Sequence, residues 1–300
     1  MGISVNHISK SYKNVKALQD ISFDVKPSEL FGLIGPDGAG KTTLFRVLTT
    51  LLIANEGTAT VAGFDVVTDY KKIRSNVGYM PGKFSLYQDL TVEENLHFFA
   101  TIFGTTIEEN YDLIKDIYVQ IEPFKNRRAG KLSGGMKQKL ALCCALIHKP
   151  KVLFLDEPTT GVDPVSRKEF WEMLKRLQQK DITILVSTPY MDEAALCDRI
   201  ALIQEGQILE IDTPEAIVKH YPKQIYNVRA NNMYQLIKSL NDYEYNHSVY
   251  PFGEFIHYTD KRKDFNPDQL LVFLKSNQLS NIEITETVAT IEDTFMELAK

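Results

Sequence analysis

Residues 35–43 read GPDGAGKTT, and what stands on either side of this stretch decides the fold. The apolar run ELFGLIG leads into it, and TTLFRVLTTLL follows with apolar residues at helical spacing. A strand, a glycine-rich loop and a helix with the pattern G-x-x-x-x-G-K-[ST] are typical of a phosphate-binding loop. Its candidate nucleotide-binding residues are Gly35, Pro36, Asp37, Gly38, Ala39, Gly40, Lys41, Thr42 and Thr43.

Such a loop suits a nucleoside triphosphate for two reasons. Its glycines let backbone N–H groups surround a phosphate, and the helix that follows presents the positive end of its dipole. We expect Lys41 to reach the β and γ phosphates and the Thr42 hydroxyl to ligate Mg²⁺.

A second apolar run, KVLFLDEP at residues 151–158, brings two carboxylates to a strand end. We expect Asp156 to hold Mg²⁺ and Glu157 to act as the general base that polarises the attacking water. Alone, the run would read as an ordinary strand followed by an acidic loop. Downstream of a phosphate-binding loop, the catalytic interpretation is favoured.

Between these two motifs, residues 132–139 read LSGGMKQK and open a helical pattern. Ser133, Gly134 and Gly135 would leave bare N–H groups at a helix N-terminus, which is a second place for an anion. Because one nucleotide hardly needs two such places from one chain, we expect this one to reach a nucleotide held by another subunit.

The surrounding pattern predicts an α/β fold: a P-loop NTPase core with a parallel sheet, helices on both faces, and antiparallel β and helical subdomains. In residues 1–30, apolar and polar side chains alternate, which is typical of half-buried antiparallel strands. Residues from about 83 to 147 should be mostly helical. A hairpin should turn at Glu205 and Gly206. With a boundary near Tyr221 and Pro222, residues 1–222 form the nucleotide-binding domain and 223–300 a small α+β domain of the ferredoxin-like kind.

Taken together, the motifs resemble those of the ATP-binding cassette (ABC) ATPase family. GPDGAGKTT matches its Walker A motif, LSGGM its signature, VLFLDE its Walker B motif and GVDP the D-loop, in the family's order. The resemblance covers roughly residues 3–221. It implies ATP and Mg²⁺ as ligands, and a head-to-tail dimer that encloses ATP between the Walker face of one subunit and the signature of the other.

The resemblance also implies roles for single residues. Thr42 and Asp156 would hold Mg²⁺, Tyr12 would stack on adenine, and Asp163 would belong to the D-loop at the dimer interface. Ser133, Gly134 and Gly135 would act in trans on the partner's nucleotide.

Within the family, the motifs and the ending TVATIEDTFMEL resemble cassette subunits of ABC-2-type exporters. Such subunits couple ATP-driven dimer closure to transport by separate, multi-spanning permease chains. They are cytoplasmic and peripheral on the inner face of the membrane. No stretch of this sequence is apolar enough to span a membrane, so any membrane role must come through a partner. For the C-terminal domain we expect a role in dimerisation or regulation.

The sequence departs from the family at three positions; Met136 replaces the usual glutamine of the signature, as in many exporters, and the other two concern catalysis. The family usually has STHYMDEA, whose histidine contacts the γ-phosphate, and here Pro189 replaces it. Gly82 replaces the usual glutamine that meets Mg²⁺ and relays to the membrane partner, and nothing places the nearby Gln88 at the metal. One lost transition-state contact typically costs about 2.7 to 4 kcal/mol, so we expect hydrolysis to be slow. ATP should still bind, because the phosphate-binding loop is intact.

Several hypotheses remain open at this point. In the first, the chain is an energy-coupling ATPase. It would act either as a homodimer in which Glu157 alone suffices for hydrolysis, or as the partner of a second, unaltered cassette. Alternatively, it is a nucleotide-gated regulatory module without meaningful turnover, or the two changes were introduced to trap a nucleotide state. A role on nucleic acid is disfavoured, because 34 Lys and Arg against 39 Asp and Glu leave a net charge of −5.

Two further expectations concern residues outside the motifs. Cys143, Cys144 and Cys197 have no metal or redox spacing and should be buried, reduced thiols. Trp171 lies in the amphipathic stretch after GVDP and should pack in the core.

Overall fold

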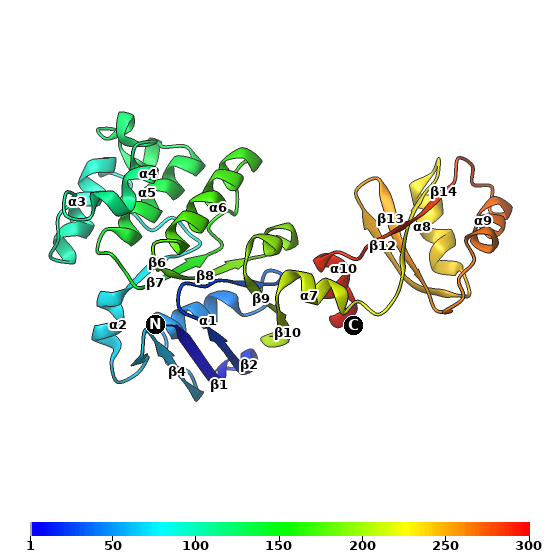
Figure 1. Ribbon diagram of the computed structural model, residues 1–300, viewed down its shortest axis with the longest axis horizontal. Helices are drawn as coiled ribbons and strands as arrows, with labels where there is room; N and C mark the ends of the chain where they lie inside the picture. Colours follow the sequence, from blue (N-terminus) through cyan, green and yellow to red (C-terminus); the bar gives the residue numbers. More distant parts are fainter. Residues whose placement is uncertain (1) are drawn as a thin grey trace. The chain divides into compact units, whose positions relative to one another are not determined.

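The computed structural model describes residues 2–300, which form two compact units (Figure 1). The first unit ends at Glu215 and the second begins at Ala216, inside helix α7 (Pro214–Lys219). The second unit therefore starts a few residues earlier than the boundary expected from the sequence. The reason is that Ile217 is fully buried and its carbonyl accepts a hydrogen bond from Thr294 Oγ1 in helix α10 (Ile291–Leu298).

A six-stranded sheet forms the core of the first unit, in the order β10-β9-β3-β8-β7-β6. Neighbouring strands are parallel from β9 to β6, and β10 pairs antiparallel with β9 at one edge. Every residue of β3, β7 and β8 is buried, as expected for central strands covered on both faces. This confirms the parallel α/β core. The strands are β3 (Leu30–Ile34), β6 (Val77–Met80), β7 (Val152–Asp156), β8 (Thr183–Thr188), β9 (Arg199–Gln204) and β10 (Gln207–Asp212).

A second, antiparallel sheet in the order β2-β1-β4-β5 lies beside helix α1. Along β1, buried side chains alternate with more exposed ones, as expected of a half-buried strand, and Ile3, Val5 and Ile8 are buried. Phe23 of this sheet stacks on Phe31 of the core sheet, with ring centroids 5.4 Å apart. The elements are β1 (Ile3–Tyr12), β2 (Val15–Val25), α1 (Lys41–Leu48), β4 (Glu56–Val61) and β5 (Phe64–Asp65).

The segment between β6 and β7 is mostly helical, as predicted. Thr91 and Glu94 form a reciprocal capping box at the start of α3. Thr106 and Glu109 exchange similar bonds, but a turn follows them and α4 begins only at Tyr111. The elements here are α3 (Val92–Ile102), α4 (Tyr111–Tyr118), η1 (Glu122–Phe124), η2 (Ala129–Lys131) and α5 (Gly134–Leu146), and β7 is followed by α6 (Pro164–Gln178) and η3 (Met191–Leu196).

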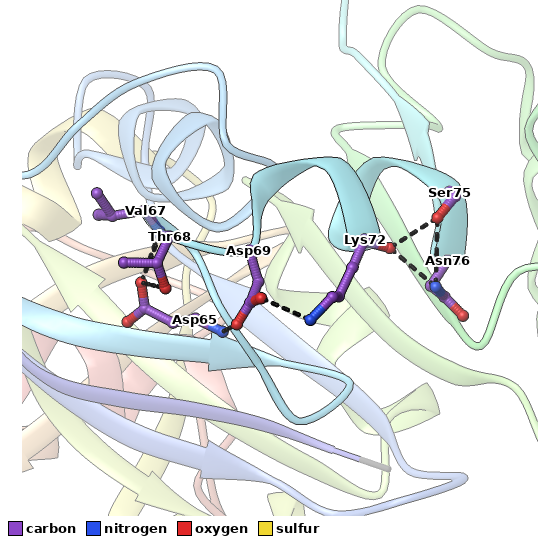
Figure 2. A network of polar contacts seen from close by, with 7 residues as sticks. All are labelled: Asp65, Val67, Thr68, Asp69, Lys72, Ser75 and Asn76. Carbon is purple, nitrogen blue, oxygen red and sulfur yellow. Dashed lines mark hydrogen bonds and ion pairs between the residues drawn. The ribbon is translucent and has the colours of Figure 1, made fainter.

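The helix α2 (Tyr70–Asn76) precedes β6, and Ser75 and Asn76 form its last turn (Figure 2). Asp65 Oδ1 accepts hydrogen bonds from the backbone N–H groups of Val67 and Thr68, at 2.9 and 2.8 Å, which turn the chain out of β5. These bonds, that of Thr68 foremost, hold the pKa of Asp65 below its usual value. A short side-chain turn of this kind is set by local polar contacts that hydrophobic periodicity does not reveal.

The second unit has the chain order βαββαβ, which is that of the ferredoxin-like motif. Its antiparallel sheet has the order β12-β13-β11-β14, and α8 and α9 share an apolar core with one face that includes Val228, Leu240, Tyr258 and Leu270. The elements are β11 (Ile225–Arg229), α8 (Met233–Asp242), β12 (Asn246–Phe252), β13 (Phe255–Asp260), α9 (Pro267–Ser276) and β14 (Glu283–Thr287), followed by α10.

Two histidine–carboxylate pairs hold α10 to this unit. His257 Nδ1 of β13 lies 2.7 Å from Asp293 Oδ1, and both side chains are buried. His247 Nε2 of β12 lies 2.9 Å from Glu297 Oε1. Burial alone would raise the pKa of Asp293, but the hydrogen bonds from His257 and Thr290 outweigh it and lower the pKa.

We predict that Asp293→Asn lowers the free energy of unfolding of this unit by about 1 to 3 kcal/mol at neutral pH, because it removes a buried hydrogen-bonded charge. A carboxyl with a lowered folded-state pKa stabilises the fold above its ordinary pKa of 3.8 and loses that contribution as the pH falls through the folded-state value. Denaturant unfolding against pH measures this, with exposed Glu292→Gln as the control. An equal effect of Asp293→Asn at acidic and neutral pH would contradict it.

Candidate nucleotide-binding site

The glycine-rich loop lies between β3 and α1, as predicted, and the neighbouring strands fix it from behind. Gly35 N–H donates to Thr188 O at the end of β8, at 3.2 Å. Ala39 O accepts from the N–H of Gly206, in the hairpin turn between β9 and β10, at 3.0 Å. Gly206 and Glu205 have φ values of 75° and 49°, as the predicted tight hairpin turn requires.

A hollow of about 540 Å³ opens over this loop. The residues lining it are Val15, Lys16, Ala17, Gln19, Gly38, Gly40, Lys41, Thr42, Thr43, Glu157 and Glu205. The predicted loop residues Thr42 and Thr43 therefore face the same space as the Walker-type Lys41 and the carboxylate of Glu157. Tyr12 ends β1 with an exposed ring near Lys10 Nζ, at 5.8 Å, so its stacking on adenine stays a prediction.

Gly40 combines a left-handed backbone conformation with a close backbone neighbour. Its φ is 105°, and a Cβ there would lie 2.4 Å from Ala17 O. Gly38 has a φ of 81° but no atom within 4 Å of a Cβ.

We therefore predict that Gly40→Ala destabilises the first unit by more than about 1 kcal/mol and weakens nucleotide binding, since alanine adds a backbone clash to the cost of its left-handed φ. The matched control is Gly38→Ala, which carries the φ cost without the clash. Calorimetric nucleotide titration and thermal unfolding of both variants measure the difference. Equal losses in the two variants would show that the clash has no effect.

Lys41 is buried and held in place by oxygen atoms. Its Nζ donates to Gly35 O at 2.7 Å and to Pro36 O at 2.9 Å, and lies 3.1 Å from Glu157 Oε1. The lysine and the glutamate predicted as catalytic therefore meet directly, although β3 and β7 are separated by β8 in the sheet.

Asp156 and Glu157 stand at the carboxyl end of β7 and are both fixed by Ser187 of β8. Ser187 Oγ donates to Asp156 Oδ1 at 2.7 Å and accepts from the N–H of Glu157 at 3.0 Å. Glu157 has a φ of 50°, an uncommon conformation for a residue with a side chain. Burial, followed by the charge of Asp156, raises the pKa of Tyr79 on β6 to about 12, so that phenol stays neutral.

The serine and glycines of residues 133–135 open helix α5, as predicted. Ser133 is the N-cap of α5 and accepts from Met136 N–H at 3.4 Å. A Cβ on Gly135 would lie 3.0 Å from Ser166 Oγ in the first turn of α6, so the two helix starts pack closely. Asp163 caps α6 by accepting from Ser166 N–H at 3.0 Å, and this bond lowers the pKa of Asp163. Ser133, Gly134, Gly135 and Asp163 do not line the hollow over the phosphate loop.

Comparison with known proteins identifies this arrangement. Residues 18–160 match the ABC transporter family. The Nod factor export ATP-binding protein I of Rhizobium sp. (strain N33) is 32% identical to this chain, over 99% of the chain and 97% of that protein. The chain belongs to the ABC transporter family. It is one of the family's ATP-binding subunits.

Two further similarities agree with this assignment. The probable multidrug ABC transporter ATP-binding protein YbhF of Escherichia coli (strain K12) is 37% identical over 99% of this chain, which spans only 52% of the length of YbhF. A solved structure of the ATP-binding subunit of an ABC transporter matches with a TM-score of 0.67 at 26% identity, over 74% of this chain and 93% of that one.

Gly82 and Pro189, which replace the usual glutamine and histidine, stand next to residues of this site. A Cβ on Gly82 would lie 3.0 Å from Asp156 O and 3.8 Å from Glu157 Cβ. Pro189 follows Thr188, whose carbonyl accepts from Gly35 N–H in the phosphate loop. The backbone carbonyl of Gln88 accepts from Gly130 N–H at 2.9 Å, and Gln88 does not line the hollow over the phosphate loop.

Sequence reasoning missed two contacts of this site: the bond of Ser187 to Asp156, and the bond of Gly206, in the predicted hairpin turn, to the phosphate loop. The signal for Ser187 was the polar pair Ser187–Thr188 at the end of an otherwise apolar strand. Other expectations were met: the three cysteines are buried and free, burial raises their thiol pKa values, and Trp171 is buried in α6.

Proposed function

We propose that this chain binds and hydrolyses MgATP at the hollow over residues 35–43 and couples that cycle to export. The observation that carries the proposal is the meeting of Lys41 and Glu157 at 3.1 Å beside the phosphate loop, with Asp156 next to them. A buried lysine facing a hollow of this size supplies charge for phosphates, and an adjacent glutamate can accept a proton from water.

The residues present fit a magnesium ion. Asp156 offers a carboxylate and Thr42 a hydroxyl, and Mg²⁺ usually binds through one or two carboxylates together with substrate phosphates and waters. Ser187 fixes one carboxylate oxygen of Asp156 by a 2.7 Å hydrogen bond. When bound, Mg²⁺ would neutralise charge on the β and γ phosphates. Lys41 would exchange its carbonyl and carboxylate partners for phosphate oxygens, and Glu157 would then be free to take the proton of water.

A second cassette would complete the site. We propose that Ser133, Gly134 and Gly135 of one subunit face the nucleotide of another, because they form a helix N-terminus outside the hollow of their own chain. Asp163 would lie beside them, since its helix α6 packs against Gly135. The partner is either a second copy of this chain or a different cassette.

The substrate-conducting partner would be a separate membrane permease. Over residues 2–300 no helix combines the length and apolar composition needed to cross a bilayer. An apolar hollow of about 420 Å³ lies between the helical segment and β6, next to Pro81, and exposed Leu51, Ile102 and Phe103 line it. We propose it as the permease contact, which would place the subunit on the cytoplasmic face of the membrane. The relatives named for Nod factor and multidrug export favour an exporter.

We further propose that hydrolysis is slow in this chain. Pro189 offers no donor to a γ-phosphate, and Gly82 offers no side chain to the metal. Pro189 directly follows Thr188, which contacts the phosphate loop, and Gly82 lies against the backbone of Asp156. The chain would then serve as the nucleotide-gated or asymmetric partner of a more active cassette.

Nucleotide titration beside steady-state phosphate release tests the proposal. We expect ATP to bind only weakly without Mg²⁺ and tightly with it, and slow release of phosphate by the purified chain that rises when a permease is present. Absence of ATP binding would overturn the nucleotide site, and turnover at an ordinary rate of about 10 per second would overturn the slow-hydrolysis proposal.

A further inference from the structure

The segment that carries Pro189 is tied to the segment that leads to Asp163 by one buried side chain, Glu193 of η3. Only 2% of the Glu193 side chain is exposed. Its Oε2 accepts from Thr188 Oγ1 at 2.5 Å and from Thr159 Oγ1 at 3.1 Å. Thr188 ends β8 and Thr159 follows Walker B, so one carboxylate oxygen joins two loops that are far apart in sequence.

On the first of these loops, the contacts enclose residue 189 from both sides. Thr188 Oγ1 donates to Glu193 and accepts from Tyr190 N–H at 3.1 Å. Glu193 N–H in turn donates to Tyr190 O at 3.3 Å. The backbone before and after Pro189 is therefore fixed through the same threonine hydroxyl and the same glutamate.

On the second loop, the fully buried Thr159 connects Glu193 to the residues expected at the dimer interface. Thr159 O accepts from Val162 N–H at 3.2 Å, directly before Asp163. Asp163 caps α6, whose Ser166 packs against Gly135 of the signature. A shift of Thr159 would therefore move the residues expected to meet the second cassette.

The other side of the glutamate faces a cation. Arg167 Nε of α6 lies 3.6 Å from Glu193 Oε1, and the Arg167 guanidinium lies 4.1 Å above the Tyr190 ring. Arg167 thus neutralises the buried carboxylate and packs against the loop that carries Pro189.

We propose that Glu193 is a positioning residue for ATP hydrolysis, which holds the loop bearing residue 189 in register with residues 158–163. This inference rests on the proposed function, because it assigns Glu193 to the reaction of that same site. It acts through Thr188 and Thr159 and touches neither nucleotide nor metal.

The test compares Glu193→Ala and Glu193→Gln with Glu172→Gln, an exposed position on α6, in full-length protein. Misplacement of catalytic groups by about 1 Å can cost 10²-fold in rate, so we expect Glu193→Ala to lower kcat by about 10- to 100-fold. The ATP dissociation constant should change less than about threefold, because the phosphate loop is untouched. Glu193→Gln keeps an acceptor oxygen and should recover part of the rate.

A double-mutant comparison shows whether Glu193 acts through the threonine. Thr159→Val should lower kcat in the otherwise unchanged chain and add little to Glu193→Ala, because its acceptor is then already gone. Full additivity, or variants of Glu193 that fold and retain the parent kcat, would overturn the proposal. So would a fall in melting temperature with kcat unchanged, which marks a merely structural contact.

Hydrogen exchange separates this inference from the proposed function, since it needs no turnover. We expect Glu193→Ala to speed exchange of the amides in residues 158–163 and 188–193 together, and Glu172→Gln to change neither. If the parent chain binds ATP but does not hydrolyse it, faster amide exchange in both segments still supports the role proposed for Glu193. Unchanged exchange in either segment overturns that role. An inactive parent chain by itself contradicts the proposed function and leaves exchange to decide on Glu193.

Discussion

Glu157→Gln is expected to lower steady-state ATP hydrolysis by about 10²- to 10⁴-fold, the usual contribution of a general base. The substitution keeps the size of the side chain and removes the carboxylate that would accept the proton of water. It also removes the ion pair in which Glu157 Oε1 lies 3.1 Å from Lys41 Nζ. Freed of that competitor, Lys41 should bind phosphates at least as well, so ATP affinity should be unchanged or higher.

Phosphate release and calorimetric titration on the same preparations measure the two effects. Glu172→Gln, an exposed position on α6, is the control and should match the parent chain in both. If Glu157→Gln keeps the parent rate, another group is the base, and the role assigned here to Glu157 is wrong.

Pro189→His is expected to raise the hydrolysis rate by about 10²-fold, because it restores a donor beside the phosphate loop, where one preorganised contact is worth about 2.7 to 4 kcal/mol. The backbone there is already placed, since Thr188 O accepts from Gly35 N–H at 3.2 Å. Histidine also returns a backbone N–H that proline lacks. The assay is single-turnover hydrolysis, which separates chemistry from product release.

Gly82→Gln combines a steric effect with a new amide group, and therefore needs its own control. A Cβ at Gly82 would lie 3.0 Å from Asp156 O, so any side chain must shift the backbone that carries Asp156. Gly82→Ala carries this steric effect without the amide. A gain in Gly82→Gln over Gly82→Ala therefore reports the metal contact alone.

A parent rate that is already ordinary and is unchanged in Pro189→His would mean that the chain hydrolyses ATP fully without the histidine, and a slow rate that stays slow would contradict the role assigned to position 189. A rate restored only when Gly82→Gln is added would mean that the two positions act together, as groups in one active site often do.

Much of the architecture follows from local sequence. The apolar runs before Gly35 and Asp156 are short and bounded by glycine or charge, which predicts buried parallel strands and places the phosphate loop and the carboxylates at their ends. The pair Thr91 and Glu94 predicts a helix start, because the two residues of a capping box lie within one helical turn of each other. The order of the four motifs then identifies the family.

The tertiary structure alone decided which residues support those motifs. Ser187 bonds to Asp156, which lies 31 positions away in the sequence. Glu193 joins Thr188 to Thr159, and Thr159 lies 34 positions from Glu193. No spacing rule relates such residues, because they meet only when the strands align in the sheet. Local patterns depend on contacts within a few residues and can be read from one sequence, whereas these contacts depend on how β7 and β8 pair.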